Sequence, residues 1–255
     1  MEGGFLDGRH ALVTGGGSGI GAAIARALAE AGAEVTVTGR RAGALEALAA
    51  AGTGLHPQVM DVTDETSVAA ATAAAVAARG PVAIHVANAG IAEGAAIHKT
   101  GLADWRRIMA TNLDGAFLSI RESLRTMRGG DWGRVIAVSS IAGLRGLKGA
   151  AAYSASKHGM VGLIRGLAAD YAGGPITFNA LCPGYVDTDI VTRNSASIAI
   201  RTGLTETEAR AAMIARNAHG RLIAPDEIAR AALWLCGPGS GSVNGQAIGI
   251  AGGET

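Results

Sequence analysis

Tyr153 and Lys157 stand four residues apart in a segment, residues 151–163, that can form a helix. Side chains at this spacing share one face of a helix, so an ammonium group would lie near a phenol. A phenol ionises near pH 10 in water, and a nearby cation lowers that pKa. Ser140 ends an apolar segment that predicts a strand. We expect a phenol that exchanges a proton and a hydroxyl that hydrogen-bonds a substrate oxygen, unless all three are ordinary surface residues.

A glycine-rich turn, residues 15–21, follows a short apolar strand at residues 11–14 and precedes a helical pattern that runs to about residue 31. Glycine lets the backbone approach a phosphate, and a helix N-terminus offers free N–H groups and the positive end of a dipole. The order of these elements predicts a dinucleotide site rather than a flexible turn. We expect cofactor contacts from Gly15, Gly17, Ser18, Gly19, Ile20 and Gly21.

The second predicted strand, residues 34–38, ends at Gly39, Arg40 and Arg41. In dinucleotide folds this tip lies at the adenosine ribose, where a carboxylate would bind the 2′-hydroxyl and repel a 2′-phosphate. A guanidinium binds phosphate through two hydrogen bonds, so the arginines favour NADP(H). NAD(H) stays possible, because both arginines can belong to a solvated turn before a helix at residues 42–50.

Strands alternate with helices along the rest of the chain, which is typical of a parallel sheet covered on both faces. We predict strands at residues 55–60, 82–87, 134–139, 175–181 and 246–250, and helices at residues 64–78, 102–127, 152–172 and 225–236. The fold class is therefore α/β, a doubly wound parallel sheet in three α/β/α layers. No linker interrupts the pattern. We expect one domain, residues 1–255, with a substrate-covering lid at about 185–220 made of a polar loop and a helix at 206–218.

Two polar residues allow more than one interpretation. Asp61 follows a predicted strand, where it would accept a hydrogen bond from an adenine amino group or cap the helix that starts near residue 63. Asn112 lies inside the helix predicted at 102–127, and its side chain competes with the backbone for hydrogen bonds. It indicates a kink or a buried water site, with a solvent-facing side chain as the alternative.

Composition excludes several classes of protein. The net charge is +1 over 255 residues, and 49% of them are hydrophobic, which argues against nucleic acid or a membrane surface as the main partner. Cys182 and Cys236 have neither zinc spacing nor a disulfide framework, so we predict no metal site and a reducing, cytoplasmic location. The chain shows neither a signal peptide nor an apolar run of about 18 residues. Cys182 is interpreted as a buried thiol rather than a nucleophile.

Together these motifs resemble the short-chain dehydrogenase/reductase family, in its single-domain branch, over nearly the whole chain. The resemblance rests on residues 14–21, Asp61, Asn88, Ala89, Gly90, the tetrad Asn112, Ser140, Tyr153 and Lys157, and Pro183, Gly184 and Thr188. It implies a Rossmann-type fold, a nicotinamide cofactor and usually a homotetramer, with interfaces at residues 102–128, at 152–172 and at the last strand. It adds these cofactor contacts: Asp61, Val62, Asn88, Ala89, Gly90, Tyr153, Lys157, Pro183, Gly184, Val186 and Thr188.

The mechanism that the resemblance implies is hydride transfer between nicotinamide and a ketone or secondary alcohol. Tyr153 would give or take the hydroxyl proton, and Lys157 would lower its pKa and bind the nicotinamide ribose. Ser140 would stabilise the developing oxyanion, and Asn112 would hold a water that links Lys157 to solvent. All four residues are present, which disfavours a catalytically silent dinucleotide-binding protein. Ser18 stands where many NADP-dependent members carry Lys or Arg.

The substrate pocket is predicted to be lined by residues 91–99, 141–150 and 185–220. Four basic residues in these segments would attract a phosphate- or carboxylate-bearing substrate or are solvated loop charges: Arg145, Lys148, Arg193 and Arg201. The chain is similar to bacterial 3-hydroxyacyl-CoA dehydrogenases and 3-oxoacyl reductases, and also to general secondary-alcohol dehydrogenases. We favour a 3-oxoacyl or 3-hydroxyacyl thioester, with small or aromatic ketones and alcohols as the alternative.

Overall fold

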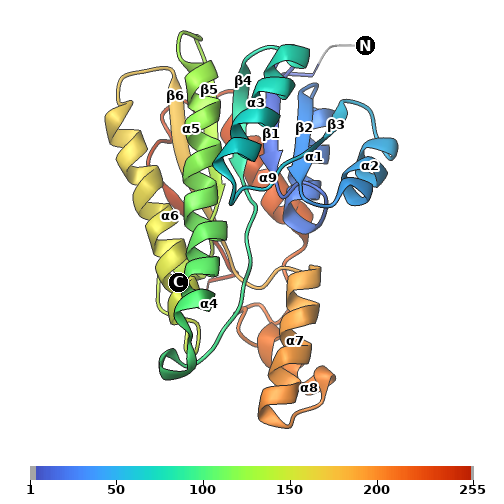
Figure 1. Cartoon of the computed structure of the whole chain (residues 1–255), viewed down its shortest axis with the longest axis vertical. Helices are drawn as coiled ribbons and strands as arrows, with labels where there is room; N and C mark the ends of the chain where they lie inside the picture. The colour runs from blue at the N-terminus through green and yellow to red at the C-terminus, as the bar shows by residue number, and fades with distance from the viewer. Residues whose placement is uncertain (1–3, 254–255) are drawn as a thin grey trace.

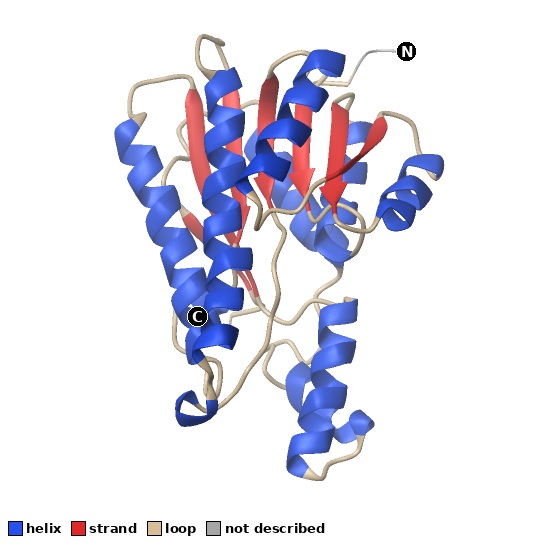
Figure 2. Ribbon diagram, viewed as in Figure 1, coloured by secondary structure: helices blue, strands red, loops and turns tan. Residues whose placement is uncertain are grey.

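The computed structural model describes residues 4–253, without the side chains of residues 193, 197, 198 and 201. In this part of the chain, seven parallel strands form a sheet in the order β3-β2-β1-β4-β5-β6-β7 (Figures 1 and 2). The chain moves outward from β1 on one side and from β4 on the other, so the switch point lies between them. The strands are β1 His10–Thr14, β2 Glu34–Gly39, β3 Leu55–Val59, β4 Val82–Ala87, β5 Gly133–Val138, β6 Ile176–Pro183 and β7 Ala247–Ile250.

Helices cover both faces of the sheet, as predicted. One core cluster joins the sheet to α1, α2 and α9, and a second joins it mainly to α5 and α6. In Figure 1, α3, α5 and α6 lie in front of the sheet and α1 and α9 behind it. This is the predicted three-layer Rossmann-type arrangement. These helices are α1 Gly19–Glu30, α2 Ala42–Ala50, α3 Glu65–Arg79, α5 Gly115–Met127, α6 Ala151–Asp170 and α9 Pro225–Cys236.

The helix predicted at residues 102–127 is interrupted. It consists of α4 (Leu102–Met109), a π-helical turn η2 (Ala110–Asp114) and α5. The N–H of Gly115 bonds the carbonyl of Ala110, five residues earlier, so one extra residue is accommodated in the turn. Such turns occur often at functional sites. Asn112 lies inside the turn and is fully buried, which rules out the solvent-facing alternative, and the irregularity of the helix at this residue takes the form of a π-helical turn.

The prediction of a polar loop after residue 185 was wrong over most of its length. Residues Asp189–Thr202 form helix α7, and Glu206–Ile214 form α8, which ends earlier than predicted. The α7 sequence is rich in Thr, Ser and Asn, which are weak helix formers, so local propensity hides the helix. Gly203 ends it with φ of 75°. Figure 1 shows both helices projecting beyond the sheet edge to which the strand arrowheads point.

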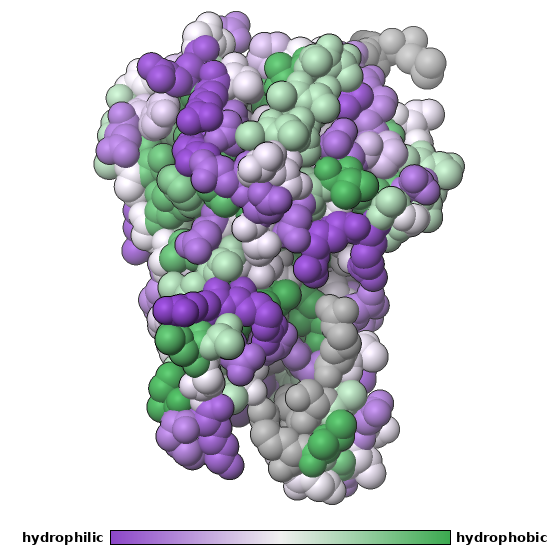
Figure 3. Space-filling model, viewed as in Figure 1, coloured by the Kyte–Doolittle hydropathy of each residue, from purple (hydrophilic) through white to green (hydrophobic). Residues whose placement is uncertain are grey.

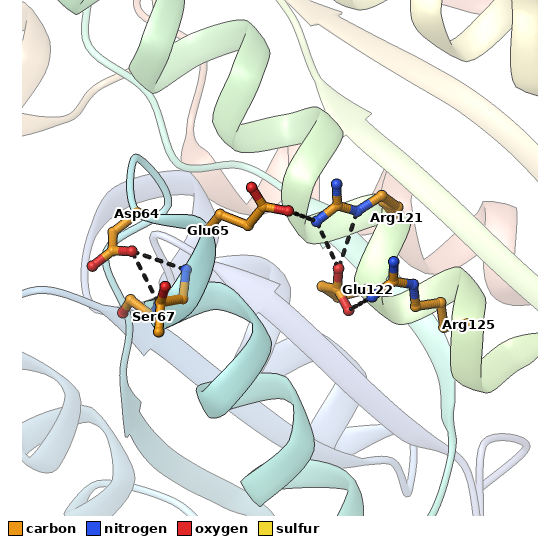
Figure 4. Close-up of polar contacts among 7 residues, drawn as sticks. Asp64, Glu65, Ser67, Arg121, Glu122 and Arg125 are labelled. Atoms are coloured by element: carbon orange, nitrogen blue, oxygen red, sulfur yellow. Dashed lines mark hydrogen bonds and ion pairs between the residues drawn. The ribbon is translucent and has the colours of Figure 1, made fainter.

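Asp64, rather than Asp61, caps helix α3. The Asp64 carboxylate accepts hydrogen bonds from the N–H groups of Thr66 and Ser67 (Figure 4). Asp61 instead accepts from the N–H of Thr63 at 3.0 Å and from its hydroxyl at 2.8 Å. The capping alternative for Asp61 is therefore wrong, because its carboxylate stabilises the turn that precedes the helix.

The same region links α3 to α5. Arg121 on α5 donates to Glu65 at the start of α3 at 2.6 Å and to the buried Glu122 at 2.8 Å, as Figure 4 shows. Arg125 donates to the other oxygen of Glu122 at 2.8 Å, so two guanidinium groups compensate the buried carboxylate.

No helix within residues 4–253 is both long and apolar enough to cross a membrane.

Candidate active site

The predicted catalytic residues gather at the C-terminal edge of the sheet. Ser140 follows β5, Tyr153 and Lys157 lie on α6, and Asn112 lies in η2. Ser139 Oγ donates to the backbone carbonyl of Lys157 at 3.1 Å and so fixes α6 to the end of β5. A Cβ at Gly143 would come 2.7 Å from the same carbonyl, so the absence of a side chain there allows this close packing.

Lys157 and Tyr153 lie side by side, as their spacing predicts. The Lys157 Nζ atom is 5.9 Å from the centroid of the Tyr153 ring and donates to the Val138 carbonyl at 2.9 Å. The Ser140 oxygen accepts from the Ala142 N–H at 3.1 Å. The Ser140 hydroxyl also hydrogen-bonds Tyr153. A ketone oxygen placed between these two hydroxyl groups would receive hydrogen bonds from both.

Burial dominates the ionisation of this pair. It raises the pKa of Tyr153, and the hydrogen bond from Ser140 opposes the shift only in part. Burial also lowers the pKa of Lys157 to about 8. We predicted that Lys157 lowers the Tyr153 pKa, but in the protein alone the shift has the opposite direction. The phenol loses solvation on folding, and this loss outweighs the hydrogen bond from Ser140, which lowers the pKa.

The Asn112 carboxamide bonds two other parts of the site. Its nitrogen donates to the Ile91 carbonyl at 2.9 Å and to Ser156 Oγ at 3.0 Å, while its oxygen accepts from the Ile91 N–H at 2.8 Å. Both side-chain donors are thus used. A water linked to Lys157 would need the backbone of the π-helical turn, where the change in hydrogen-bond register frees carbonyl groups.

The glycine turn is fixed to the end of β4. Asn88 Nδ2 donates to the carbonyls of Thr14 at 3.0 Å and Gly15 at 3.1 Å. Thr14 Oγ1 accepts from the N–H groups of Asn88 at 3.0 Å and Ala89 at 3.1 Å. At Gly15, φ is 63° and a Cβ would come within 2.9 Å of the Ala89 Cα atom. Asn88 and Ala89 therefore shape the turn whether or not they touch a cofactor.

The start of α1 fits a pyrophosphate. Ser18 is its N-cap but its side chain bonds no backbone N–H, and no acidic residue lies in the first turn. The first N–H groups of a helix have no partner within the helix, and they carry the positive end of its dipole. A Cβ at Gly21 would collide with the Gly15 carbonyl, so glycine is required there.

Both arginines lie at the predicted adenosine end, with different neighbours. Arg41 Nη2 donates to Ser18 Oγ at 3.4 Å. The Asp61 pKa is lowered mainly by the Thr63 N–H and further by the Thr63 hydroxyl and the Arg40 charge. Val62, the other residue predicted here, is buried against the start of α5, where a Cβ at Gly115 would lie 2.8 Å from a Val62 methyl carbon.

The segments predicted to bind nicotinamide lie next to the glycine turn and to the tetrad Asn112, Ser140, Tyr153 and Lys157. A Cβ at Gly90 would lie 3.3 Å from Asn112 Oδ1 and 3.6 Å from Lys157 Nζ. A Cβ at Gly19 would lie 3.1 Å from the Thr188 methyl group. Pro183 ends β6, and Gly184, Val186 and Thr188 follow in that order. The structure thus brings together segments separated by some 170 residues in the chain, Gly19 to Thr188.

Several residues of the site escaped the sequence argument. Ser156 Oγ accepts a hydrogen bond from the Asn112 carboxamide, and Asn217 hydrogen-bonds the backbone of Tyr185, the residue after Gly184. The Tyr185 phenol lies close enough to Tyr153 for its ionisation to raise the Tyr153 pKa. Its place directly after Pro183 and Gly184 was the only available signal. Ser156 and Asn217 depend on long-range contacts that no sequence motif indicates.

The other residues considered in the sequence are four basic residues of the predicted pocket and the thiol of Cys182. Arg145 is half-buried and Lys148 is exposed, while the side chains of Arg193 and Arg201 lie outside the described part of the chain. Cys182 is a buried free thiol, and burial raises its pKa, so it is no activated nucleophile. Within residues 4–253, no three His, Cys, Asp or Glu side chains form a group that would hold a metal ion.

Known proteins share this arrangement. The sequence model of the short chain dehydrogenase family matches residues 9–199. Cis-4-hydroxycyclohexanecarboxylate dehydrogenase of Sinomonas cyclohexanicum is 40% identical over 251 residues, which cover 97% of this chain and 96% of the relative. Acetoacetyl-CoA reductase of Shinella zoogloeoides is 37% identical over 248 residues, which cover 96% and 98%. The crystal structure of an actinorhodin polyketide ketoreductase variant with NADPH has a TM-score of 0.93 at 35% identity and covers 96% and 97%.

The chain therefore belongs to the short-chain dehydrogenase family. It is an oxidoreductase that transfers a hydride between a nicotinamide cofactor and a ketone or secondary alcohol.

Proposed function

We propose that the protein is an NADP(H)-dependent ketone reductase in which Tyr153 is the proton donor. The observation that carries this proposal is the cluster of Tyr153, Ser140 and Lys157 beside the glycine turn. Bound nicotinamide supplies the hydride for reduction. Tyr153 donates its proton to the substrate oxygen, and Ser140 donates a hydrogen bond to the same oxygen while negative charge develops there. Lys157 binds the nicotinamide ribose and stabilises the resulting phenolate.

Three basic or hydroxyl side chains support NADP(H) as the cofactor. Arg41 and Ser18 are hydrogen-bonded to each other, and Arg40 adds a positive charge at the same strand tip. A 2′-phosphate near them would receive charge-assisted hydrogen bonds from the guanidinium groups. We assign Asp61 to the adenine, through the carboxylate oxygen that Thr63 does not use. The ketoreductase structure with NADPH is consistent with this assignment.

For the substrate we favour a 3-oxoacyl thioester. The names of acetoacetyl-CoA reductase and of the polyketide ketoreductase support this class. A second candidate is a small or ring-shaped ketone, and the relative named cis-4-hydroxycyclohexanecarboxylate dehydrogenase, at 40% identity, favours it. In either case residues 91–99, 141–150 and 185–220 would line the pocket.

The test compares wild type with Tyr153→Phe on a panel of acetoacetyl-CoA, cyclohexanones and aryl ketones. We expect wild type to oxidise NADPH fastest with acetoacetyl-CoA. The variant should lose kcat by at least about 100-fold, since general acid catalysis contributes about 10²–10⁴-fold, while NADPH still binds. Turnover within tenfold of wild type would refute the role of Tyr153. Turnover of the plain ketones alone would refute the thioester. NADPH binding with no turnover of any compound would indicate a silent dinucleotide-binding protein.

We also propose that the chain acts as a single domain in a cytoplasmic homotetramer, with residues 185–220 as its lid. The lid proposal rests on α7 and α8, which project beyond the sheet edge that carries the site (Figure 1). Closure over bound NADPH and a substrate analogue should protect this segment from proteolysis, and unchanged cleavage would contradict it. Cell fractionation tests the location.

A further inference from the structure

Asn217 has a buried side chain whose contacts the proposed mechanism does not use. It lies in the loop after α8 and is 1% exposed. Its oxygen accepts from the Tyr185 N–H at 2.9 Å, and its nitrogen donates to the Tyr185 carbonyl at 2.8 Å. The same nitrogen donates to the Arg221 carbonyl at 2.8 Å. One carboxamide thus binds both backbone groups of Tyr185, and we call this pair of bonds the Asn217 clamp.

Neighbouring bonds extend the clamp into a small parallel ladder. The Ile223 N–H donates to the Tyr185 carbonyl at 3.0 Å, and the Asp187 N–H donates to the Ile223 carbonyl at 2.9 Å. Val186 and Ile223 form an isolated parallel bridge. The segment 184–187, which leaves the end of β6, is therefore fixed to the segment 217–223, through which the chain returns from α8 to α9.

Gly184 is held from two sides. Its N–H donates to the Ile250 carbonyl at 3.0 Å. A Cβ there would come within 2.6 Å of Asn217 Oδ1 and 3.2 Å of the Ala251 side chain. The backbone at this point is thus enclosed between the Asn217 clamp and the end of β7. Loss of the Asn217 side chain would open one of these two sides.

The clamped segment has a functional position. It lies directly between Pro183, at the end of β6, and Thr188, which contacts the glycine turn near Gly19. It also carries Tyr185, whose ionisation would raise the pKa of Tyr153. We propose that nicotinamide packs against this backbone. A shift of the backbone would therefore change the position of the nicotinamide relative to Tyr153, the proposed proton donor.

We infer that Asn217 is a positioning residue for hydride transfer, which sets the place of residues 184–186 relative to Tyr153 through the Asn217 clamp. This inference rests on the proposed function, because it assumes that these residues cover the nicotinamide. A displacement of about 1 Å between reacting groups costs up to about 100-fold in rate. The adenosine and pyrophosphate contacts lie elsewhere, at Arg41 and the start of α1, so cofactor affinity should change much less than the rate.

The experiment uses the full-length enzyme with Asn217→Ala, Asn217→Ser and the control Arg210→Gln. Arg210 on α8 donates to the Asp187 side chain at 2.9 Å, so its removal releases the far end of the segment 184–187 and leaves both Asn217 bonds to Tyr185 in place. Three quantities are measured: kcat, the isotope effect on kcat with NADPH deuterated at the transferred position, and the NADPH dissociation constant. Hydrogen exchange at residues 184–187 provides a readout that needs no turnover.

We expect Asn217→Ala to lower kcat by about 10- to 100-fold and to enlarge the isotope effect, with an NADPH dissociation constant within about threefold of wild type. Exchange at Tyr185 should accelerate in both Asn217 variants and not in Arg210→Gln. Asn217→Ser, which leaves room for a water, replaces the Ala variant if that variant does not fold. A merely structural role would lower thermal stability and leave kcat per folded enzyme and the isotope effect unchanged, which would overturn the inference.

Failure of the proposed function would look different. A Tyr153→Phe variant that keeps its turnover would remove the assigned proton donor, while a slowed hydride step in Asn217→Ala would still support positioning. If no substrate were turned over, the exchange data would decide. NADPH should protect residues 184–187 in wild type and fail to do so in Asn217→Ala. Equal protection in both would refute the inference.

Discussion

Burial sets the charge states of Tyr153 and Lys157. The raised pKa of Tyr153 keeps the phenol protonated at neutral pH, the state that a proton donor needs for ketone reduction. The lowered pKa of Lys157, about 8, places the loss of its charge within the working range of an enzyme. Burial of the ammonium group costs folding stability, and in the proposed mechanism the same group acts in its charged form.

This pair predicts the pH dependence of reduction. The rate should be constant below a pH of about 8 and fall above it, as Lys157 loses its proton. In Lys157→Arg any residual activity should lack this fall, because a guanidinium stays charged.

The free energy of unfolding should change with pH in the opposite direction to the rate. Between pH of about 8 and 10.5 the unfolded chain binds more protons, so the free energy of unfolding should rise with pH. Reduction rates and urea unfolding from pH 6 to 10.5 measure both, and a flat rate profile would exclude Lys157 as the titrating group.

The two arginines have different partners, which predicts separable contributions to the choice of cofactor. Arg41 bonds Ser18, whereas Arg40 interacts with Asp61, so we place Arg41 nearer to a 2′-phosphate. Arg41→Ala should raise the KM for NADPH by about 10- to 100-fold, the equivalent of about 1.5–3 kcal/mol for a charged hydrogen bond. The KM for NADH should barely change. Arg40→Ala is the matched control and should have the smaller effect. Equal KM values for NADPH in wild type and Arg41→Ala would contradict this assignment.

At the scale of elements, the π-helical turn η2 places Asn112 where an ordinary helix would not. The turn buries the carboxamide between the segment that follows β4 and helix α6. Ile91 begins the loop predicted to line the substrate pocket, and Glu93 on that loop forms an ion pair with Arg107 of α4 at 2.6 Å. The α4–η2 unit therefore holds this loop at two points.

Asn112→Ala should damage both folding and catalysis. It leaves the buried Ser156 and both backbone groups of the partly buried Ile91 without their bonds. We therefore expect a loss of about 2–4 kcal/mol in the free energy of unfolding and a fall of at least about tenfold in kcat/KM. Thr111→Ala, which removes one bond within the same turn to the Arg107 carbonyl, serves as the control. Urea unfolding and steady-state kinetics measure the two effects. An Asn112→Ala enzyme with wild-type stability and wild-type activity would refute the proposed role of Asn112 in the π-helical turn.

At the scale of the molecule, α5 and α6 line an open surface groove of about 350 Å³. Phe117 is 43% exposed, and Figure 3 shows apolar surface among polar side chains on the face that α5 and α6 present. The groove also contains Arg121, Arg125, Arg128 and Asp170. Apolar side chains with both signs of charge suit a self-complementary contact between two copies about a twofold axis.

The proposed tetramer depends on this groove. Phe117→Glu would place a charge in the contact, so we expect dimers or monomers in place of tetramers by light scattering. Ile200→Glu is the control, because Ile200 is 88% exposed on α7, far from the groove in sequence. A wild-type chain that is monomeric at micromolar concentration would contradict the tetramer itself. If Phe117→Glu still forms tetramers, the interface does not include this groove.

The sequence alone determined what depends on local order. Strand, glycine turn and helix follow one another in the chain, and Tyr153 and Lys157 pair because they lie one helical turn apart. Every predicted strand, and each helix other than those at 102–127 and after 185, begins and ends within two residues of its predicted bounds. The hydrophobic period of 3.6 or 2 residues carries this information without knowledge of the fold.

Only the tertiary structure decided the rest, because burial and long-range contacts depend on which elements pack together. Asn112 bonds Ser156, 44 residues away, and Asn217 bonds Tyr185, 32 residues away. The direction of the Tyr153 pKa shift depends on the loss of solvation at that position, which no spacing reports. Helix α7 forms despite weak local propensity, so its partners in the fold, rather than its own residues, account for it.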